Sequence, residues 1–187
     1  MRRLLLLLLL ATPLTAAEIE AGVAHVAALA RKQGDLTIEM GRGFGAEVEV
    51  FWSDVLSTRA AATFVNPAVY TSRVDLGTLG LDIYSASARW HLRPHSHLSP
   101  FAGAGGAFVV IGDLDDRFGD EVKIEFDAKV APLVEGGLRY RVHPRIALEL
   151  GATYMPLEAE GDVAFPDIPR RIAVDPLIVS AGASWRF

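Results

Sequence analysis

Charged residues that could pair with one another recur at even spacings inside otherwise apolar segments. Arg89 and His91 are two positions apart, and Glu135, Arg139 and Arg141 follow one another at even intervals. In an extended strand, residues at even spacing point to the same face. Guanidinium and carboxylate groups that share a buried face must pair, because an uncompensated buried charge is strongly destabilising. The spacing therefore predicts a network of buried ion pairs.

Other residue types in the chain would suit metal binding or hydrolysis, but their surroundings do not. His91, His95 and His97 carry imidazoles that suit transition metals, yet no carboxylate or cysteine lies beside them. The acidic segment 113–121 lacks the glycine and the final glutamate of an EF-hand loop. No local signature pairs His25 or His91 with a serine nucleophile. We therefore expect no metal, no cofactor and no enzymatic activity.

The N-terminal segment has the three parts of a secretory signal peptide. Arg2 and Arg3 are positively charged, residues 4–10 are all leucine, and a segment rich in small residues follows up to Ala17. The apolar run is shorter than the roughly 20 residues that a membrane helix needs. We expect a cleavable signal peptide at residues 1–17 and one domain at residues 18–187.

Composition excludes some functions and leaves the location open. The chain has no cysteine, so neither a lipid anchor on cysteine nor a disulfide framework is available. Its formal net charge of −5 gives no reason to expect nucleic acid as a partner. Because 51% apolar residues is close to the globular average, the pattern within segments has to decide between a soluble and a membrane protein.

Alternation of apolar and polar residues, bounded by turn residues, recurs eight times after the signal. The first segment is also compatible with a short helix over residues 21–31. Connections between the segments alternate between long and short, as in bacterial barrels with long extracellular loops and short periplasmic turns. The pattern predicts an all-β fold, an eight-stranded antiparallel transmembrane β-barrel in the bacterial outer membrane. The expected strands are 18–28, 44–52, 58–66, 80–92, 99–111, 126–141, 145–156 and 172–187.

The phase of the alternation indicates which residues face lipid. In the segment 126–141, Lys129 and Arg139 share one phase while Val130 and Leu138 share the other. A charge facing lipid near the midplane costs about 2–4 kcal/mol, so the charges should face the lumen. Aromatic residues fall where an interfacial girdle is expected; those assigned to the periplasmic girdle are Trp52, Trp90, Phe101, Tyr140, Trp185 and Phe187. A soluble barrel or sandwich with an aromatic core is the alternative.

Sorting the inward residues by height divides the lumen into two parts. The periplasmic part is predicted to be a polar plug, made of Arg59, Arg89, Glu135, Arg139, Glu149 and Arg186. The extracellular part is predicted to be apolar and open, lined by Val65, Leu81, Ile83, Phe108, Val110 and Met155. The apolar residues could simply pack, or they could form a site for a small apolar ligand. Pro132 and Pro176 are candidate weak points in the wall.

With these strands in register, the chain resembles the OmpW family of small outer-membrane barrels. The matching stretches are Ala88-Arg89-Trp90-His91-Leu92, residues 99–105, residues 136–141 with 150–155, and Val174-Asp175-Pro176 running on to Ser184-Trp185-Arg186-Phe187. The resemblance implies an eight-stranded barrel whose narrow, partly hydrophobic interior is associated with binding or passage of small apolar molecules. The first loop of this chain is short, which departs from the family pattern.

These observations favour an outer-membrane barrel for passive binding or passage of small apolar molecules. The alternative is a structural or surface-interaction barrel whose loops contact lipopolysaccharide, host or phage and whose lumen transports nothing. The expected partners are outer-membrane lipid, lipopolysaccharide and a small apolar solute. The sequence leaves the oligomeric state open.

The signal peptide gives a first testable prediction. Because small residues suited to signal peptidase precede Glu18, we expect the protein isolated from outer membranes to begin at Glu18. Intact mass measurement would check this, and a chain that retains residues 1–17 would contradict it.

Overall fold

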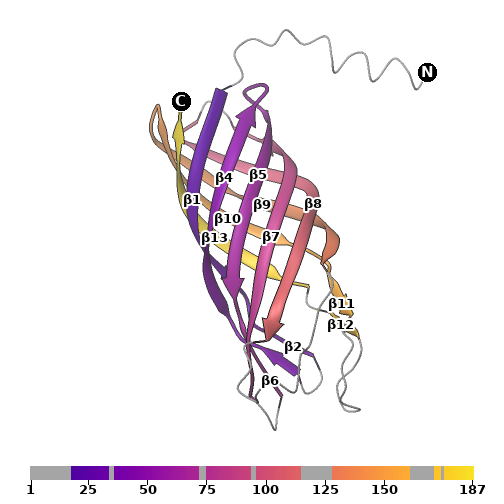
Figure 1. Ribbon diagram of the computed structural model, residues 1–187. Coiled ribbons are helices and arrows are strands. Elements are labelled where there is room, and N and C mark those ends of the chain that lie inside the picture. The colour runs from indigo at the N-terminus through magenta and orange to yellow at the C-terminus, as the bar shows by residue number, and fades with distance from the viewer. Residues whose placement is uncertain are drawn as a thin grey trace, which may run out of the picture.

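Eight long strands close into an antiparallel barrel (Figure 1). The computed structural model describes residues 18–33, 36–71, 75–93, 96–114, 128–160, 171–173 and 175–187. Around the barrel the order is β7-β5-β4-β1-β13-β10-β9-β8, and pairing of β7 with β8 completes the ring. The strands are β1 (Glu18–Ala28), β4 (Gly41–Phe51), β5 (Leu56–Asn66), β7 (Asp75–His91), β8 (Leu98–Leu114), β9 (Lys129–His143), β10 (Ile146–Tyr154) and β13 (Leu177–Arg186).

Short strands extend the structure at the end opposite the start of β1 and the end of β13 (Figure 1). β2 (Arg31–Gln33), β3 (Leu36–Ile38) and β6 (Ala68–Thr71) pair in that order and join the start of β7. β11 (Glu158–Glu160) and β12 (Arg171–Ala173) form a separate hairpin. Tyr70 on β6 donates a hydrogen bond to Glu39 over 2.8 Å, and this bond raises the pKa of the Tyr70 hydroxyl. The first two long connections are therefore joined into one extracellular sheet.

The predicted all-β barrel of eight antiparallel strands is confirmed. The first segment, for which a helix was the alternative, is strand β1 and bonds to both β4 and β13. β7 and β8 are longer than predicted, with 17 residues each, because their extracellular ends continue into loop segments. Among the described residues, no helix is long and apolar enough to cross a membrane. The predicted signal peptide lies outside the described residues.

The outer wall carries the apolar residues that face lipid. Exposed large hydrophobic side chains occur on every barrel strand, and Trp52, Trp90 and Trp185 lie exposed near the periplasmic ends, as an interfacial girdle requires. Phe101 was predicted to belong to this girdle, and that prediction is wrong, because its side chain points inward and is 4% exposed. Its cross-strand partner is Gly137, where an added Cβ would collide with the Phe101 ring. The glycine leaves the space that the ring occupies.

The outward phase of β10 yields a prediction about stability. Leu150 lies in the middle of β10 and is 53% exposed on the lipid side. Leu150→Arg should destabilise the folded barrel by about 2–4 kcal/mol, because it places a charge in hydrocarbon. Leu177→Arg, at the extracellular end of β13, is the control and should cost about 1 kcal/mol or less. Equilibrium urea unfolding in lipid vesicles measures both, and equal costs would contradict the assigned depth.

Candidate functional site

Ionised side chains from seven of the eight barrel strands meet in the periplasmic half of the lumen. They form one connected network of hydrogen bonds and ion pairs, which we call the plug. Its members are Glu20, Glu47, Glu49, Ser57, Arg59, Ser87, Arg89, His91, Glu135, Arg139, Glu149, Ser184 and Arg186. The even spacing of these residues within each strand places them all on the inner face.

Arg89 lies at the centre of the plug. Its guanidinium group contacts Glu135 through two hydrogen bonds of 3.0 Å each. It also reaches both oxygens of Glu149, at 3.1 Å and 3.0 Å, and lies 3.5 Å from Glu49. The Arg89 guanidinium carbon lies 4.3 Å from the centre of the Phe101 ring, a cation–π arrangement. One cation thus holds three carboxylates from three other strands.

Arg139 forms the second centre, nearer the periplasm. It donates to Glu20 and, over 3.1 Å, to Glu49. Glu20 also accepts a 3.1 Å hydrogen bond from Ser184 and a 2.8 Å hydrogen bond from Arg186. Both Ser184 and Arg186 belong to β13, whereas Glu20 belongs to β1. The plug therefore crosses the junction of the first and last barrel strands.

Glu49 joins the two centres and has two further partners. The Ser57 hydroxyl donates to Glu49 over 2.5 Å and lies 3.0 Å from Nε2 of His91. The same His91 nitrogen lies 3.2 Å from Glu49. All three residues are 3% exposed or less. A buried acidic group is thus surrounded by hydrogen-bond donors, as a charge inside a narrow barrel requires.

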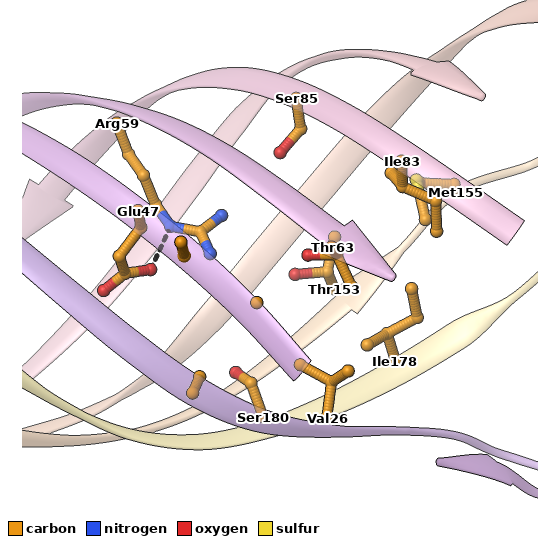
Figure 2. Close-up of a pocket in the computed structure, with 13 residues that line it drawn as sticks. Val26, Glu47, Arg59, Thr63, Ile83, Ser85, Thr153, Met155, Ile178 and Ser180 are labelled. Carbon is orange, nitrogen blue, oxygen red and sulfur yellow. Dashed lines mark hydrogen bonds and ion pairs between the residues drawn. The ribbon is translucent and has the colours of Figure 1, made fainter. Parts of the chain in front are cut away.

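A small cavity of about 30 Å³ lies on the extracellular side of the Glu47–Arg59 ion pair. Figure 2 shows hydroxyl groups of Thr63, Ser85, Thr153 and Ser180 around it. Apolar side chains, including Ile83 and Met155, line its other end. A cavity of this volume has room for one or two water molecules, and these hydroxyl groups would serve as their hydrogen-bond partners. It separates the plug from an apolar layer above.

The apolar layer fills the extracellular half of the lumen. Four predicted lining residues, Val65, Leu81, Ile83 and Met155, face inward with exposures of 0%, 1%, 3% and 1%. They pack with inward residues of the neighbouring strands into one hydrophobic cluster, whose other members include Val26, Leu79, Val109, Ile111, Leu133, Leu157 and Ile178. The prediction that this half is open is therefore wrong, because these side chains fill the space between the walls.

Two predicted lining residues face the wrong way for that role. Phe108 and Val110 lie on the outer wall of β8 and are 46% and 36% exposed, so the inward apolar positions nearby are Val109 and Ile111. Four consecutive apolar residues hide the phase of the strand at this end. Further down, the inward positions of β8 opposite Ser87 and Arg89 are glycines, which carry no charge to mark the inner face.

The six predicted plug residues all face the lumen, and the network contains members that the sequence did not single out. Glu20 and Ser57 were missed, although Glu20 shares the phase of Glu18 and Gly22 in the first strand. Of the three histidines weighed as metal ligands, the structure describes His91 and His97 and places them in different surroundings. His91 is buried in the plug, whereas His97 is exposed and contacts the Arg141 carbonyl oxygen over 3.1 Å. His95 lies outside the described residues, among which no group of three potential metal ligands occurs.

The plug yields a prediction about stability. Arg89→Met would leave the buried Glu135 and Glu149 without their main cation, so the free energy of unfolding should fall by about 3–5 kcal/mol. Adding Glu135→Gln to Arg89→Met should recover part of that loss. Arg42→Met is a matched control, because Arg42 is exposed on the outer wall. Urea unfolding in vesicles measures all three, and an Arg89 effect no larger than the Arg42 effect would contradict the role of the plug.

Comparison with known proteins gives the same architecture. No family model and no curated protein sequence matches the chain. Among solved structures, the chain is similar to the outer membrane protein OprG from Pseudomonas aeruginosa, with a TM-score of 0.73 and 14% identity over 91% of this chain and 95% of that chain. It is also similar to the outer membrane protein AlkL, with a TM-score of 0.67 and 19% identity over 91% and 90% of the two chains. Neisserial surface protein A follows with a TM-score of 0.60 and 17% identity over 91% and 97%.

These similarities agree with the closed antiparallel barrel described above. The chain has the fold of small outer-membrane β-barrels such as OprG and AlkL.

Proposed function

We propose that this barrel carries small apolar molecules passively from the cell exterior into the bilayer, through the wall between β9 and β10. The observation that supports this most directly is a break in the hydrogen-bonded wall beside the apolar layer. The proposal needs no cofactor and no energy input, because movement from water into hydrocarbon is favourable for an apolar solute.

The wall is incomplete at the extracellular end of the β9–β10 pair. These strands pair from the periplasmic end only as far as Val134 and Tyr154. Beyond that point, residues 129–133 of β9 pair with β8. Met155, the residue after β10, continues the pairing on the β13 side only, since its amide donates to the Pro176 carbonyl oxygen over 3.2 Å. We call the stretch of wall between residues 130–133 and 155–157, where β9 and β10 no longer pair with each other, the seam.

Two prolines explain why pairing stops there. The Arg141 amide donates to His97 on the β8 side, so the even-numbered residues of β9 point toward β10. By the same alternation, Met155 points toward β13 and the even-numbered residues of β10 point toward β9. Continuing the register would set Pro132 opposite Pro156. Proline has no amide hydrogen, so neither hydrogen bond of this pair can form.

Apolar side chains lie on both sides of the seam. On the inner side, Leu133 and Met155 are buried members of the apolar layer. On the outer side, Val130 and Val134 are exposed to lipid. A solute that leaves the apolar layer here would pass directly from the apolar interior of the barrel to the hydrocarbon of the bilayer. Movement of these buried side chains has to open the way, since they close the seam at rest.

Two further observations favour this route over others. The plug fills the periplasmic half of the lumen with buried ion pairs, so straight axial flow is the least favourable path. Pro176, the second predicted weak point, is less suitable than Pro132. The wall beside it is fastened by hydrogen bonds between Leu157 and Asp175 of 2.9 Å and 3.2 Å.

The alternative proposal is a surface-interaction barrel. It is favoured by the ordered extracellular sheet of β2, β3 and β6. One similar structure, with a TM-score of 0.55 and 14% identity, is Ail, the attachment invasion locus protein of Yersinia pestis, in complex with the heparin analogue sucrose octasulfate. Lipopolysaccharide and host or phage surfaces are the proposed partners in that case. Exchange of residues 29–40 and 67–74 would then abolish binding to these surfaces, whereas substitutions at the seam would not.

We further propose that the protein is not an enzyme. The grouping of Ser57, His91 and Glu49 has the residue types of a catalytic triad. Ser57, however, is completely buried and its hydroxyl group donates to Glu49. A nucleophile must reach its substrate, so these contacts favour a structural role for the group.

The seam can be tested by restoring its amide hydrogens. Pro132→Val with Pro156→Val should let the ladder continue, and we expect protein-dependent uptake of a hydrophobic fluorophore such as N-phenylnaphthylamine into cells to fall at least about fivefold. Stability should not fall, because each regained hydrogen bond contributes about 1 kcal/mol. Initial rates of fluorescence increase in cells measure the uptake.

Pro100→Val is the matched control for this experiment. Pro100 also faces outward on a barrel strand, but it lies in β8 beside Leu138 of β9, away from the seam. Its replacement should leave uptake unchanged. Unaltered uptake in the double seam variant would sink the proposed route.

A further inference from the structure

Two neighbouring periplasmic turns carry an unusual concentration of basic residues. The turn between β7 and β8 spans residues 92–97, and the turn between β9 and β10 follows β9 at residues 144–145. Together with the end of β9 they contain Arg93, His97, Arg141, His143 and Arg145 and no acidic residue. We call these five residues the basic turns.

The two turns touch one another. The amide of Arg141 donates to the His97 carbonyl oxygen over 2.7 Å, and Nδ1 of His97 lies 3.1 Å from the Arg141 carbonyl oxygen. The carbonyl oxygen of Arg145 accepts a 2.8 Å hydrogen bond from the amide of Arg186. These bonds hold the end of β9 against the turn at residues 92–97 and tie Arg145 to β13.

The cations of the basic turns are not used by the plug. Arg93 and Arg145 are exposed, and neither forms an ion pair within the described residues. Among the described acidic groups at this end of the barrel, Glu18 pairs with Arg186 over 2.5 Å. Asp54 lies in the turn between β4 and β5, where the Val55 carbonyl oxygen accepts a 2.8 Å hydrogen bond from the His91 amide, so this carboxylate neighbours the turn that carries Arg93. The basic turns set three arginines against this one carboxylate. The cluster thus presents net positive charge toward the periplasm.

The depth of the basic turns is set by their neighbours on the outer wall. Leu92 precedes Arg93, Leu98 follows His97, and Tyr140 precedes Arg141, and these three apolar or aromatic side chains are exposed to lipid. Aromatic residues of this kind mark the interface between hydrocarbon and headgroups. We therefore expect Arg93, which follows Leu92 directly, near the level of the phosphates.

We propose that the basic turns bind the phosphate group of an anionic phospholipid in the periplasmic leaflet. Guanidinium groups match phosphate oxygens in geometry and charge, and a basic side chain near an anionic membrane surface favours binding. A lipid is favoured over a soluble acidic partner because the cluster borders lipid-facing residues on both turns. The site is independent of the seam, which lies at the other end of the barrel.

The experiment uses Trp90 as a reporter, since it is exposed on the outer wall beside the turn at residues 92–97. The full chain with Trp52→Phe and Trp185→Phe retains Trp90 alone and is reconstituted in phosphatidylcholine bilayers that contain dibrominated phosphatidylglycerol. Bromine quenches tryptophan on contact, so the quenching relative to dibrominated phosphatidylcholine gives the local enrichment of the anionic lipid. We expect enrichment of at least about fivefold, with each arginine contributing up to about that factor.

Arg93→Ala with Arg145→Ala should abolish the enrichment, and about 0.5 M salt should reduce it by screening. Arg42→Ala is the matched control, because Arg42 is equally exposed but lies at the extracellular end of β4. Normal shifts of unheated and heated samples on gels would verify folding of every variant.

Three results would overturn the proposal. These are equal quenching by both lipids, enrichment that survives in the double variant, and enrichment that is lost equally in Arg42→Ala. Sedimentation of the protein with isolated peptidoglycan tests whether the basic turns bind this acidic polymer of the periplasm instead of a lipid. Binding there that depends on Arg93 and Arg145, without a lipid preference, would assign the cluster to that polymer and overturn the lipid site.

Discussion

The structure depends on the requirement that every charge inside a narrow barrel has a partner of opposite sign. Arg89 and Arg139 meet this requirement by bridging carboxylates from β1, β4, β9 and β10. No arginine or glutamate of the plug could be moved to the outer wall without placing a charge in hydrocarbon. The same constraint fixes the inward phase of each strand that contributes a charge, and with it the register of its apolar residues against lipid.

This constraint explains what could be predicted from the sequence. Strands that carry charge, such as β9 with Glu135 and Arg139, have an unambiguous inner face, and their phase was predicted correctly. β8 has no charge between Leu98 and Gly112, and its inner face in the middle is glycine and alanine. Phe101, Phe108 and Val110 were therefore assigned to the wrong sides. Alternation along a strand predicts which residues face inward only where the two faces of the strand differ in polarity.

Other features depend on contacts between strands that are distant in the sequence. The pairing of Glu20 with Arg139 spans 119 positions, so no local pattern reveals it. The filling of the extracellular lumen follows from the volumes of inward residues on several strands at once, such as Val65, Leu81 and Met155. The break between β9 and β10 likewise required the register, because only the register sets Pro132 opposite Pro156. A single proline in the sequence shows where a hydrogen bond is missing, but it does not show which residue lies opposite.

The contacts of Glu20 have a consequence for assembly of the barrel. β1 and β13 are the barrel strands farthest apart along the chain, and the ring is complete only once they pair. Glu20 on β1 receives two of its donors, Ser184 and Arg186, from β13. Before β13 pairs with β1, the Glu20 carboxylate would lack these two hydrogen-bond donors while it lies in the poorly hydrated interior of an open sheet. The pairing of β1 with β13 and the completion of the ion pairs inside the lumen therefore occur together. This coupling disfavours partly closed barrels in the membrane.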